Sequence, residues 1–352
     1  MIAIDGSQGE GGGQVLRSAL GLSILTGQAF QIDRIRGRRK KPGLLPQHLK
    51  AVDAAAAISK AQVDGAALGS MRLKFQPGEI RSGRYKFDIG TAGATSLVLQ
   101  TIFLPLSLAH SASTVIITGG THVPWSPVFH YLDLHWLPYM LEIGFDARLS
   151  LEAGGFYPQG GGRLSATIRP AGELSPLRLS RRGNLHSIRG LSAVSNLDIS
   201  IADRQKRQAL RRLEGYSNIT KIKSFQMPAH SKGTFLLLLA EFEHSRCCYS
   251  ALGELGKPAE RVADEAVDAL ESFLKAGAAS SDEGTADIAI DQHLADQLLL
   301  PLSFAGGASE FTTNQVTAHL QTNANIIQAF SPVKIDIQGD MGQPGKVRII
   351  PA

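Results

Sequence analysis

The sequence predicts a mixed α/β protein in which a large domain of three related αβ repeats carries a smaller inserted αβ domain. Three observations support this prediction. A pattern of strand, glycine turn and helix occurs three times, and the sequence pattern changes after Arg182. The composition is that of an ordinary globular protein. The chain has 352 residues, of which 43% are hydrophobic and 19% charged. This length suits one large domain or two domains.

The repeated pattern is weak but ordered. The segment IAIDGSQGEGGGQVLRSALGLSIL reads as a short strand, a glycine-rich turn and a helix with apolar residues at Leu16, Leu20 and Ile24. FDIGTAGATSLVLQTIFLPL, from Phe87, repeats this order, and SEFTTNQVTAHLQTNANIIQAF, from Ser309, again leads into a helix. The uneven separations exclude a solenoid and favour duplicated αβ units in one layered domain.

A compact insert is predicted between two parts of the large domain. Its elements are a strand in GNLHSIRGLSAVS, a basic helix in IADRQKRQALRRLEGY, a buried strand in GTFLLLLAEFEH and an amphipathic helix in PAERVADEAVDALESFLKAG. The Gly/Ala/Ser-rich stretch AGAASSDEGTADI then reads as a linker. We therefore assign 184–279 to the small inserted domain, and 1–183 plus 280–352 to the large repeat-built domain.

The composition also indicates a compartment. The start, MIAIDGSQGEGGG, lacks the features of a secretory signal, and no apolar run is long enough for a membrane helix. Cys247 and Cys248 are neighbours, so they do not staple distant segments, and no Cys/His pattern suggests zinc. These features predict a cytoplasmic protein with no membrane partner.

The net charge of +5 weakly favours a polyanionic partner such as nucleic acid. Six of the eight residues from Arg34 to Lys41 are basic. Two further basic groups are Arg178, Arg181, Arg182 and Arg189, and then Arg204, Lys206, Arg207, Arg211 and Arg212. A solvated surface explains such runs about as well, and a nuclear localisation signal is a third reading of the first run.

The glycine-rich loop is the first candidate site. Gly9 and 11–13 lie between a strand and a helix, where backbone N–H groups can receive an anion. The loop is neither a Walker A motif nor a dinucleotide fingerprint, because Gln14 stands at the last glycine position of the latter. A tight turn is the alternative. Glu10 would oppose an anion unless it held a metal or paired with an arginine, and Arg17 lies within reach.

A phosphate pocket is the second candidate. Arg36, Arg38 and Arg39 offer planar guanidinium groups that engage phosphate oxygens in pairs. Gln47 and His48 begin the next helical stretch and add neutral donors. An exposed surface face is the alternative.

His319 is the third candidate. Its same-face neighbours on the predicted helix are Thr322 and Asn323, whereas Leu320 and its apolar partners face the core. The histidine therefore projects from a polar face. A lone histidine is usually structural, but imidazole can also serve as a covalent nucleophile toward a phosphoryl group.

Six ordered segments resemble the RNA 3′-terminal phosphate cyclases of the catalytic class. They are GSQGEGGGQVLRSAL, IRGRRKKPGLLPQHL, IGTAGATSLVLQT, GFYPQGGG, LADQLLLPL and TAHLQTN. The resemblance extends from residue 2 to about residue 340 and is thinnest across 184–279. It implies the repeat-and-insert fold, an ATP-consuming ligase-type reaction and a divalent metal such as Mg²⁺. The nucleophilic histidine takes AMP from ATP and passes it to an RNA 3′-phosphate, and the vicinal 2′-hydroxyl then closes a 2′,3′-cyclic phosphate.

The resemblance also implies residue roles. His319 is the nucleophile, and Glu10 and Asp296 are metal candidates. The implied nucleotide contacts are Gln100, His293, Leu294, Ala295, Asp296 and Gln297. The implied phosphate and RNA-end contacts are Arg17, Arg36, Arg39, Gln47 and His48.

Two positions depart from the family pattern. Gly154 precedes GFYPQGGG where relatives often carry a basic residue, and His293 stands where an aromatic ring could stack on adenine. DNA 3′-phosphates are a further candidate substrate, and the oligomeric state is open.

Three other readings remain. A non-catalytic cyclase-like protein of RNA processing shares the fold but lacks the histidine, which His319 in TAHLQTN argues against. A small-molecule transferase built from related repeats is a second alternative, and a plain RNA-binding module is a third.

Overall fold

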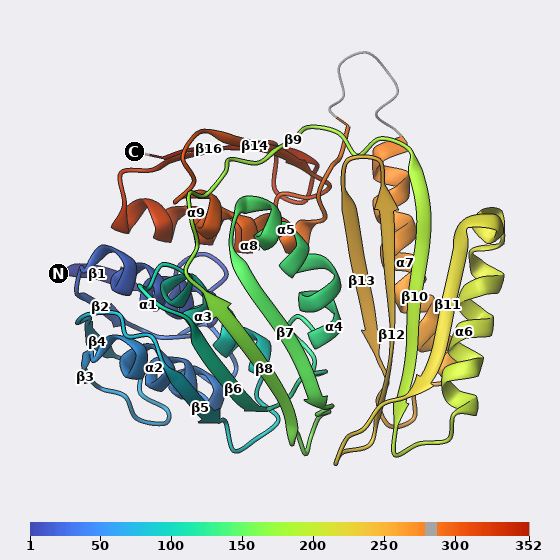
Figure 1. Cartoon of the computed structure of the whole chain (residues 1–352), viewed down its shortest axis with the longest axis horizontal. Helices are drawn as coiled ribbons and strands as arrows, with labels where there is room; N and C mark the ends of the chain where they lie inside the picture. Colours follow the sequence, from blue (N-terminus) through green and yellow to red (C-terminus); the bar gives the residue numbers. More distant parts are fainter. Residues whose placement is uncertain (279–286, 352) are drawn as a thin grey trace.

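The computed structural model describes residues 1–278 and 287–351. In this part of the chain the strands form four sheets of four strands each, and helices lie between and beside them (Figure 1). This arrangement confirms the predicted mixed α/β class.

Three of the sheets share one topology. In each, the first strand along the chain pairs in parallel with the second, the second pairs antiparallel with the fourth, and the fourth pairs antiparallel with the third. Parallel neighbours need a crossover, and a helix supplies it each time. The same connectivity three times over is the structural form of the sequence repeat.

The elements follow in chain order. The first unit contains β1 (Ile2–Asp5), α1 (Gln14–Thr26), β2 (Phe30–Asp33), α2 (Pro46–Ser59), β3 (Gln62–Asp64) and β4 (Leu73–Gln76). The second contains β5 (Arg84–Asp88), α3 (Thr95–Ser107), β6 (Ser113–Gly119), α4 (Phe129–Tyr131), the π-helix η1 (Leu132–Trp136), α5 (Leu137–Ile143), β7 (Asp146–Ala153) and β8 (Gly162–Arg169). The third contains β9 (Arg178–Leu179), α8 (Gln292–Leu302), β14 (Ser309–Thr313), α9 (Ala318–Phe330), β15 (Lys334–Gln338) and β16 (Gly345–Ile350).

The fourth sheet lies on the chain between β9 and α8. Its elements are β10 (Leu185–Ser195), α6 (Ser200–Arg212), the 3₁₀ helix η2 (Glu214–Ile219), β11 (Thr220–Gln226), β12 (Gly233–Phe242), β13 (Arg246–Leu252) and α7 (Ala259–Ala278). In Figure 1 it stands at the right of the molecule, with β13 beside α4 and α5. The predicted linker 276–288 falls largely outside the described residues, so the boundaries 184–279 and 280–352 stay a prediction.

Strand β12 is buried on both faces, which explains its uninterrupted leucine run. Leu236 and Leu238 pack into a core with the residues of α7, whereas Leu237 and Leu239 join the main core of the molecule. The fourth sheet is therefore fastened to the rest of the protein by apolar burial.

Helices α1, α3, α8 and α9 bring the first, second and third units together. Helix α1 packs against α3 and α9, and α8 packs against α9. The predicted helical faces are confirmed, because Leu16 and Leu20 of α1 and Leu320 of α9 are fully buried. In Figure 1, α8 and α9 lie between the sheet of β14 and β16 and the helices of the first unit. No helix among the described residues is long and apolar enough to span a bilayer.

Replacing Leu237 with alanine tests how tightly the fourth sheet is fastened. The side chain is 0% exposed in the main core, so Leu237→Ala should lower the free energy of unfolding by about 2–5 kcal/mol in denaturant titrations. Leu68→Ala is the control, because Leu68 is 66% exposed. Equal, small effects of the two variants would show that the sheet packs only loosely.

Candidate active site

His319 lies in the first turn of α9. Thr317 caps this helix, and its Oγ1 accepts the N–H of Leu320 at 3.1 Å. The imidazole is 53% exposed, as predicted for a side chain on a polar face. Its Nδ1 lies 2.5 Å from Oε1 of Gln14, the first residue of α1. The helices of the first and third units thus meet at this histidine.

The hydrogen bonds fix which ring nitrogen of His319 is free. The amide Nε2 of Gln14 donates to Asp296 Oδ2 at 2.8 Å, so its Oε1 must face the histidine. A carbonyl oxygen only accepts, and Nδ1 therefore carries the proton. In the neutral ring Nε2 then holds the lone pair, and it lies 3.9 Å from the Glu10 carboxylate. An unprotonated, accessible imidazole nitrogen is what a nucleophile requires.

The glycine-rich loop approaches α9 closely. A Cβ at Gly9 would lie 2.0 Å from Thr322 Oγ1, so this position admits only glycine. The contact lets the backbone N–H of Glu10 donate to Thr322 Oγ1 at 3.1 Å. The carboxylate of Glu10 is 5% exposed, forms an ion pair with Arg39, and lies 3.9 Å from His319 Nε2. The glycine-rich loop therefore places the Glu10 carboxylate beside Nε2 of His319.

Arg17 and His48 flank the loop at Gly13. A Cβ on Gly13 would lie 2.4 Å from His48 Nε2 and 2.7 Å from Arg17 Nη1, so both nitrogens converge on this glycine. Burial lowers the pKa of Arg17 to about 10, although the charges of Glu10 and Asp296 act in the opposite direction. Arg17 therefore remains a cation near neutral pH.

His48 is a neutral donor. Burial lowers its pKa to about 3, and the charges of Arg17 and Arg36 add to the effect. Its Nδ1 accepts the N–H of Leu45 at 3.2 Å, so the ring proton is on Nε2. A cation and a neutral N–H thus point to one spot, which suits an anionic oxygen.

The remaining phosphate candidates take different positions. Arg36 Nη1 donates to the carbonyls of Lys41 and Gly43 at 2.6 and 2.9 Å and so holds the basic loop together. Gln47 Oε1 accepts the N–H of Ala94 at 3.0 Å, which ties the first glycine turn to the second. Of the five candidates, Arg17, Arg39 and His48 surround Glu10 and Gly13 directly.

The nucleotide candidates divide into two groups. Gln100 Nε2 donates to Gln297 Oε1 at 2.7 Å, and Gln297 Nε2 contacts the carbonyl of His293 at 2.6 Å and the hydroxyl of Tyr131 at 3.3 Å. Together they form a polar face at the first turns of α8. Leu294 and Ala295 are fully buried, so their side chains face the core instead.

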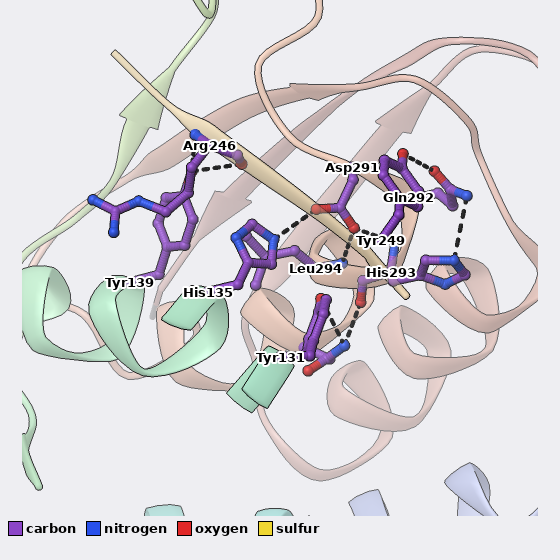
Figure 2. Close-up of polar contacts among 10 residues, drawn as sticks. Tyr131, His135, Tyr139, Arg246, Tyr249, Asp291, Gln292, His293 and Leu294 are labelled. Atoms are coloured by element: carbon purple, nitrogen blue, oxygen red, sulfur yellow. Dashed lines mark hydrogen bonds and ion pairs between the residues drawn. The ribbon is translucent and has the colours of Figure 1, made fainter. Parts of the chain in front are cut away.

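Asp291 holds the first turn of α8 in place. Its Oδ1 accepts the N–H groups of His293 and Leu294, both at 3.0 Å, and its Oδ2 accepts Nε2–H of His135 at 2.6 Å. Figure 2 shows this cluster, with Tyr249 contacting Gln292 beside it. Asp291 and His135 are fully buried, and His135 lies on the π-helix. Because Asp291 satisfies the helix N-terminus, α8 offers side chains rather than free N–H groups to a ligand.

The structure shows the surroundings of Gly154 and His293, the two residues that depart from the family pattern. A Cβ at Gly154 would lie 2.4 Å from Met227 Cε, and its N–H donates to the carbonyl of Pro228 at 2.7 Å. A larger side chain there would push against the β11–β12 connection. The exposed His293 ring stands edge-on to Tyr249, 6.2 Å between centroids.

Much of the second and third basic groups serves the fold. Buried Arg182 donates to the carbonyls of Phe273 and Leu274 near the end of α7. Arg204 pairs with Glu260, and Arg212 pairs with three acidic residues of α7. These arginines join α6 to α7, which favours the structural reading of the basic helix.

Sequence reasoning missed Gln14, Asp291 and His135. Gln14 was noted only for failing a motif, although its place at the start of a helix after a glycine loop was the available signal. Asp291 precedes the helix LADQLLLPL as an N-cap would. His135 contacts Asp291, which lies 156 residues away in the sequence, and no local sequence pattern predicts such a contact.

A divalent metal fits the site only if substrate phosphates and water supply most of its ligands. Oε1 of Glu10 is buried and has no hydrogen-bond partner among the described residues. No cluster of three or more metal-ligating side chains occurs in that part of the chain. One carboxylate oxygen suits Mg²⁺, which commonly takes most of its ligands from substrate phosphates and water.

Acid titration tests the cap of α8. Burial alone would raise the pKa of Asp291, but His135 and the N–H of Leu294 together bring it below its ordinary value of 3.8. Asp291→Ala should therefore cost about 2 kcal/mol or more near neutral pH. A depressed pKa stabilises the fold above the unfolded value, so the gap between wild type and variant should shrink below about pH 4. The exposed Asp146 is the control. A gap that stays constant into acid would contradict the assignment.

The comparisons with known proteins identify the family of the chain. Residues 8–337 match the model of the RNA 3′-terminal phosphate cyclase family. Proteins called RNA 3′-terminal phosphate cyclase are 43% identical in Ralstonia nicotianae, over 96% of this chain and 94% of the relative, and 44% identical in Pseudomonas fluorescens, over the same shares. A solved enolpyruvyl transferase, NikO from Streptomyces tendae, aligns with 12% identity over 99% of this chain and 81% of that one. Its TM-score of 0.25 carries no argument. The family match and the identity over nearly the whole chain confirm the resemblance read from the motifs, and the chain belongs to the RNA 3′-terminal phosphate cyclase family.

Proposed function

We propose that this protein uses ATP to convert an RNA 3′-phosphate into a 2′,3′-cyclic phosphate, through an AMP adduct on His319. The observation that carries the proposal is the hydrogen-bond chain Asp296–Gln14–His319, which places the lone pair of the neutral imidazole on Nε2, beside the ion pair of Glu10 and Arg39. Family membership supports the same reaction.

In the first step, His319 Nε2 attacks the α-phosphorus of ATP. A phosphorus–nitrogen bond forms, the bond to pyrophosphate breaks, and the ring becomes positively charged. Nδ1–H remains bonded to Gln14 Oε1, with the Asp296 carboxyl behind the amide. This arrangement stabilises the charge and holds the ring in its attacking orientation.

In the second step, an oxygen of the RNA 3′-phosphate attacks the same phosphorus and releases the histidine. Arg17 and His48 supply a buried cation and a neutral N–H for the anionic end, and Arg39 supplies a further cation. In the third step, the 2′-hydroxyl attacks the activated phosphate, loses its proton and expels AMP. The hydroxyl is already held next to its target, so proximity lowers this barrier.

Glu10 would hold a divalent ion such as Mg²⁺ through its unpartnered Oε1. Such an ion supplies charge neutralisation for the phosphates during nucleotidyl transfer. We assign the adenosine side of ATP to the polar face of α8, with His293, Gln297 and Gln100 as its contacts. Asp296 then serves mainly through Gln14, which differs from the direct metal role first considered.

The other readings make different predictions. A non-catalytic relative would bind RNA without forming an AMP adduct, and a small-molecule transferase would not depend on RNA ends. We propose a cytoplasmic protein with a large domain at 1–183 and 280–352 and an insert at 184–279, and RNA rather than DNA as its main substrate.

His319→Ala should abolish the AMP adduct, because the variant removes the imidazole nitrogen that lies beside Glu10. Intact-mass spectrometry after incubation with ATP and Mg²⁺ measures the adduct. His244→Ala is the matched control, since that imidazole is 43% exposed on the β12–β13 turn. An adduct that persists in folded His319→Ala protein would move the nucleophile elsewhere.

Arg39→Ala should slow cyclisation of 3′-phosphate RNA by at least about tenfold, the cost of one charge-assisted hydrogen bond. Self-adenylation should fall less, since the arginine serves the RNA end. Separate single-turnover assays measure the two steps. Arg169→Ala removes another arginine that pairs with an acid, Asp146, and should change neither. Equal losses in both steps would show that Arg39 serves ATP instead.

A further inference from the structure

Trp125 stands out from the surface without packing on it. Its side chain is 99% exposed, although tryptophan is usually buried. Its backbone φ is 63°, in the left-handed region that bulky residues rarely adopt. A strained backbone that presents a fully solvated indole is typical of a position kept for a ligand.

The loop that carries Trp125 joins two parts of the candidate active site. At its start, Gly120 accepts the N–H and Oγ1 of Thr95, at the head of the helix that carries Gln100. At its end, the chain enters α4, where the hydroxyl of Tyr131 accepts from Gln297. Trp125 therefore lies on the loop that connects these two anchors.

A second exposed aromatic residue follows on the neighbouring loop. His122 and Phe156 form a parallel bridge, and the N–H groups of residues 121 and 122 both donate to Gly155. The two loops leave this bridge in the same direction. Tyr157, next to Phe156, is 71% exposed. Beneath the bridge, the buried rings of His122 and Phe156 stack 5.3 Å apart, which gives both loops a packed base.

The surface continues from Tyr157 toward the fourth sheet. His230 lies beside Gly161, in the same loop as Tyr157. It also borders a hollow between the end of β7 and the fourth sheet, whose polar lining includes Asn196, Asp198 and Gln226. Lys232 nearby is exposed and forms no ion pair with any residue that the structure describes. The loop of Tyr157, the exposed Lys232 and the amide groups of the hollow thus lie on neighbouring segments, together with the carboxylate of Asp198.

We propose that Trp125 and Tyr157 form a stacking platform for unpaired bases of the RNA just upstream of its 3′ end. This inference rests on the proposed function and adds a binding site to it. Exposed aromatic rings hold single-stranded RNA by stacking, without sequence preference, and a cation follows the backbone. Both rings are largely solvated, at 99% and 71% exposure, which leaves their faces open to stacking bases.

RNA affinity and self-adenylation separate this site from the catalytic one. Trp125→Ala should weaken binding of a short single-stranded RNA with a 3′-phosphate about tenfold, measured by fluorescence anisotropy without ATP. Trp125→Phe should restore most of the affinity, because it keeps a ring. Self-adenylation with ATP alone should match wild type in both. Tyr216→Ala, at the opposite end of β11, is the aromatic control and should bind normally.

Intrinsic fluorescence tests contact directly. The sequence has two tryptophans, and Trp136 is buried at 3% exposure, so Trp136→Phe leaves Trp125 as the sole reporter. The RNA should quench this emission, and ATP alone should not. Quenching by ATP alone, or slower self-adenylation in Trp125→Ala, would place the ring on the nucleotide and overturn the platform.

Unchanged RNA affinity in Trp125→Ala would also overturn the platform, even if the wild-type protein cyclises RNA normally. Failure of the proposed function is distinguishable, because wild-type protein would then produce no cyclic end.

Discussion

The hydrogen-bond chain from Asp296 through Gln14 to His319 is the constraint on which the site depends. Each member comes from a different helix, α8, α1 and α9, and two of the three helices belong to the third unit. With Asp296 ionised, the amide of Gln14 can satisfy both neighbours in only one orientation. That orientation protonates Nδ1 of the histidine and frees Nε2. The chemistry of the ring is therefore set by how the helices pack.

The surrounding contacts hold these helices at the required spacing. Ser18 Oγ donates to Asn323 Oδ1 at 2.6 Å, and Asn323 Nδ2 donates to the carbonyl of Asp296 at 2.8 Å, which links α1, α9 and α8 a second time. Gly9 permits the glycine loop to lie against Thr322. The triple repeat supplies the framework, since it places equivalent helices from different units side by side.

Local patterns could predict the elements and the chemically active residues, but not their mutual contacts. The glycine turn before α1, the leucine run of β12 and the polar face around His319 are visible because their periodicity or composition is local. Gln14 and the pair Asp291–His135 are partners across more than a hundred residues, and only the fold shows them. The basic groups were ambiguous for the same reason. Arg212 looks free in sequence, yet in the structure its charge faces the acids of α7.

A pulse-chase experiment with ATP labelled at the α-phosphate tests the central claim most directly. Wild-type protein with Mg²⁺ should take up acid-labile label, and unlabelled ATP with 3′-phosphate RNA should then release it as AMP while a 2′,3′-cyclic end forms. The label should leave at the rate at which cyclic ends first appear. Folded protein that never takes up label, or label that stays while cyclic ends form, would contradict an adenylated histidine as the intermediate.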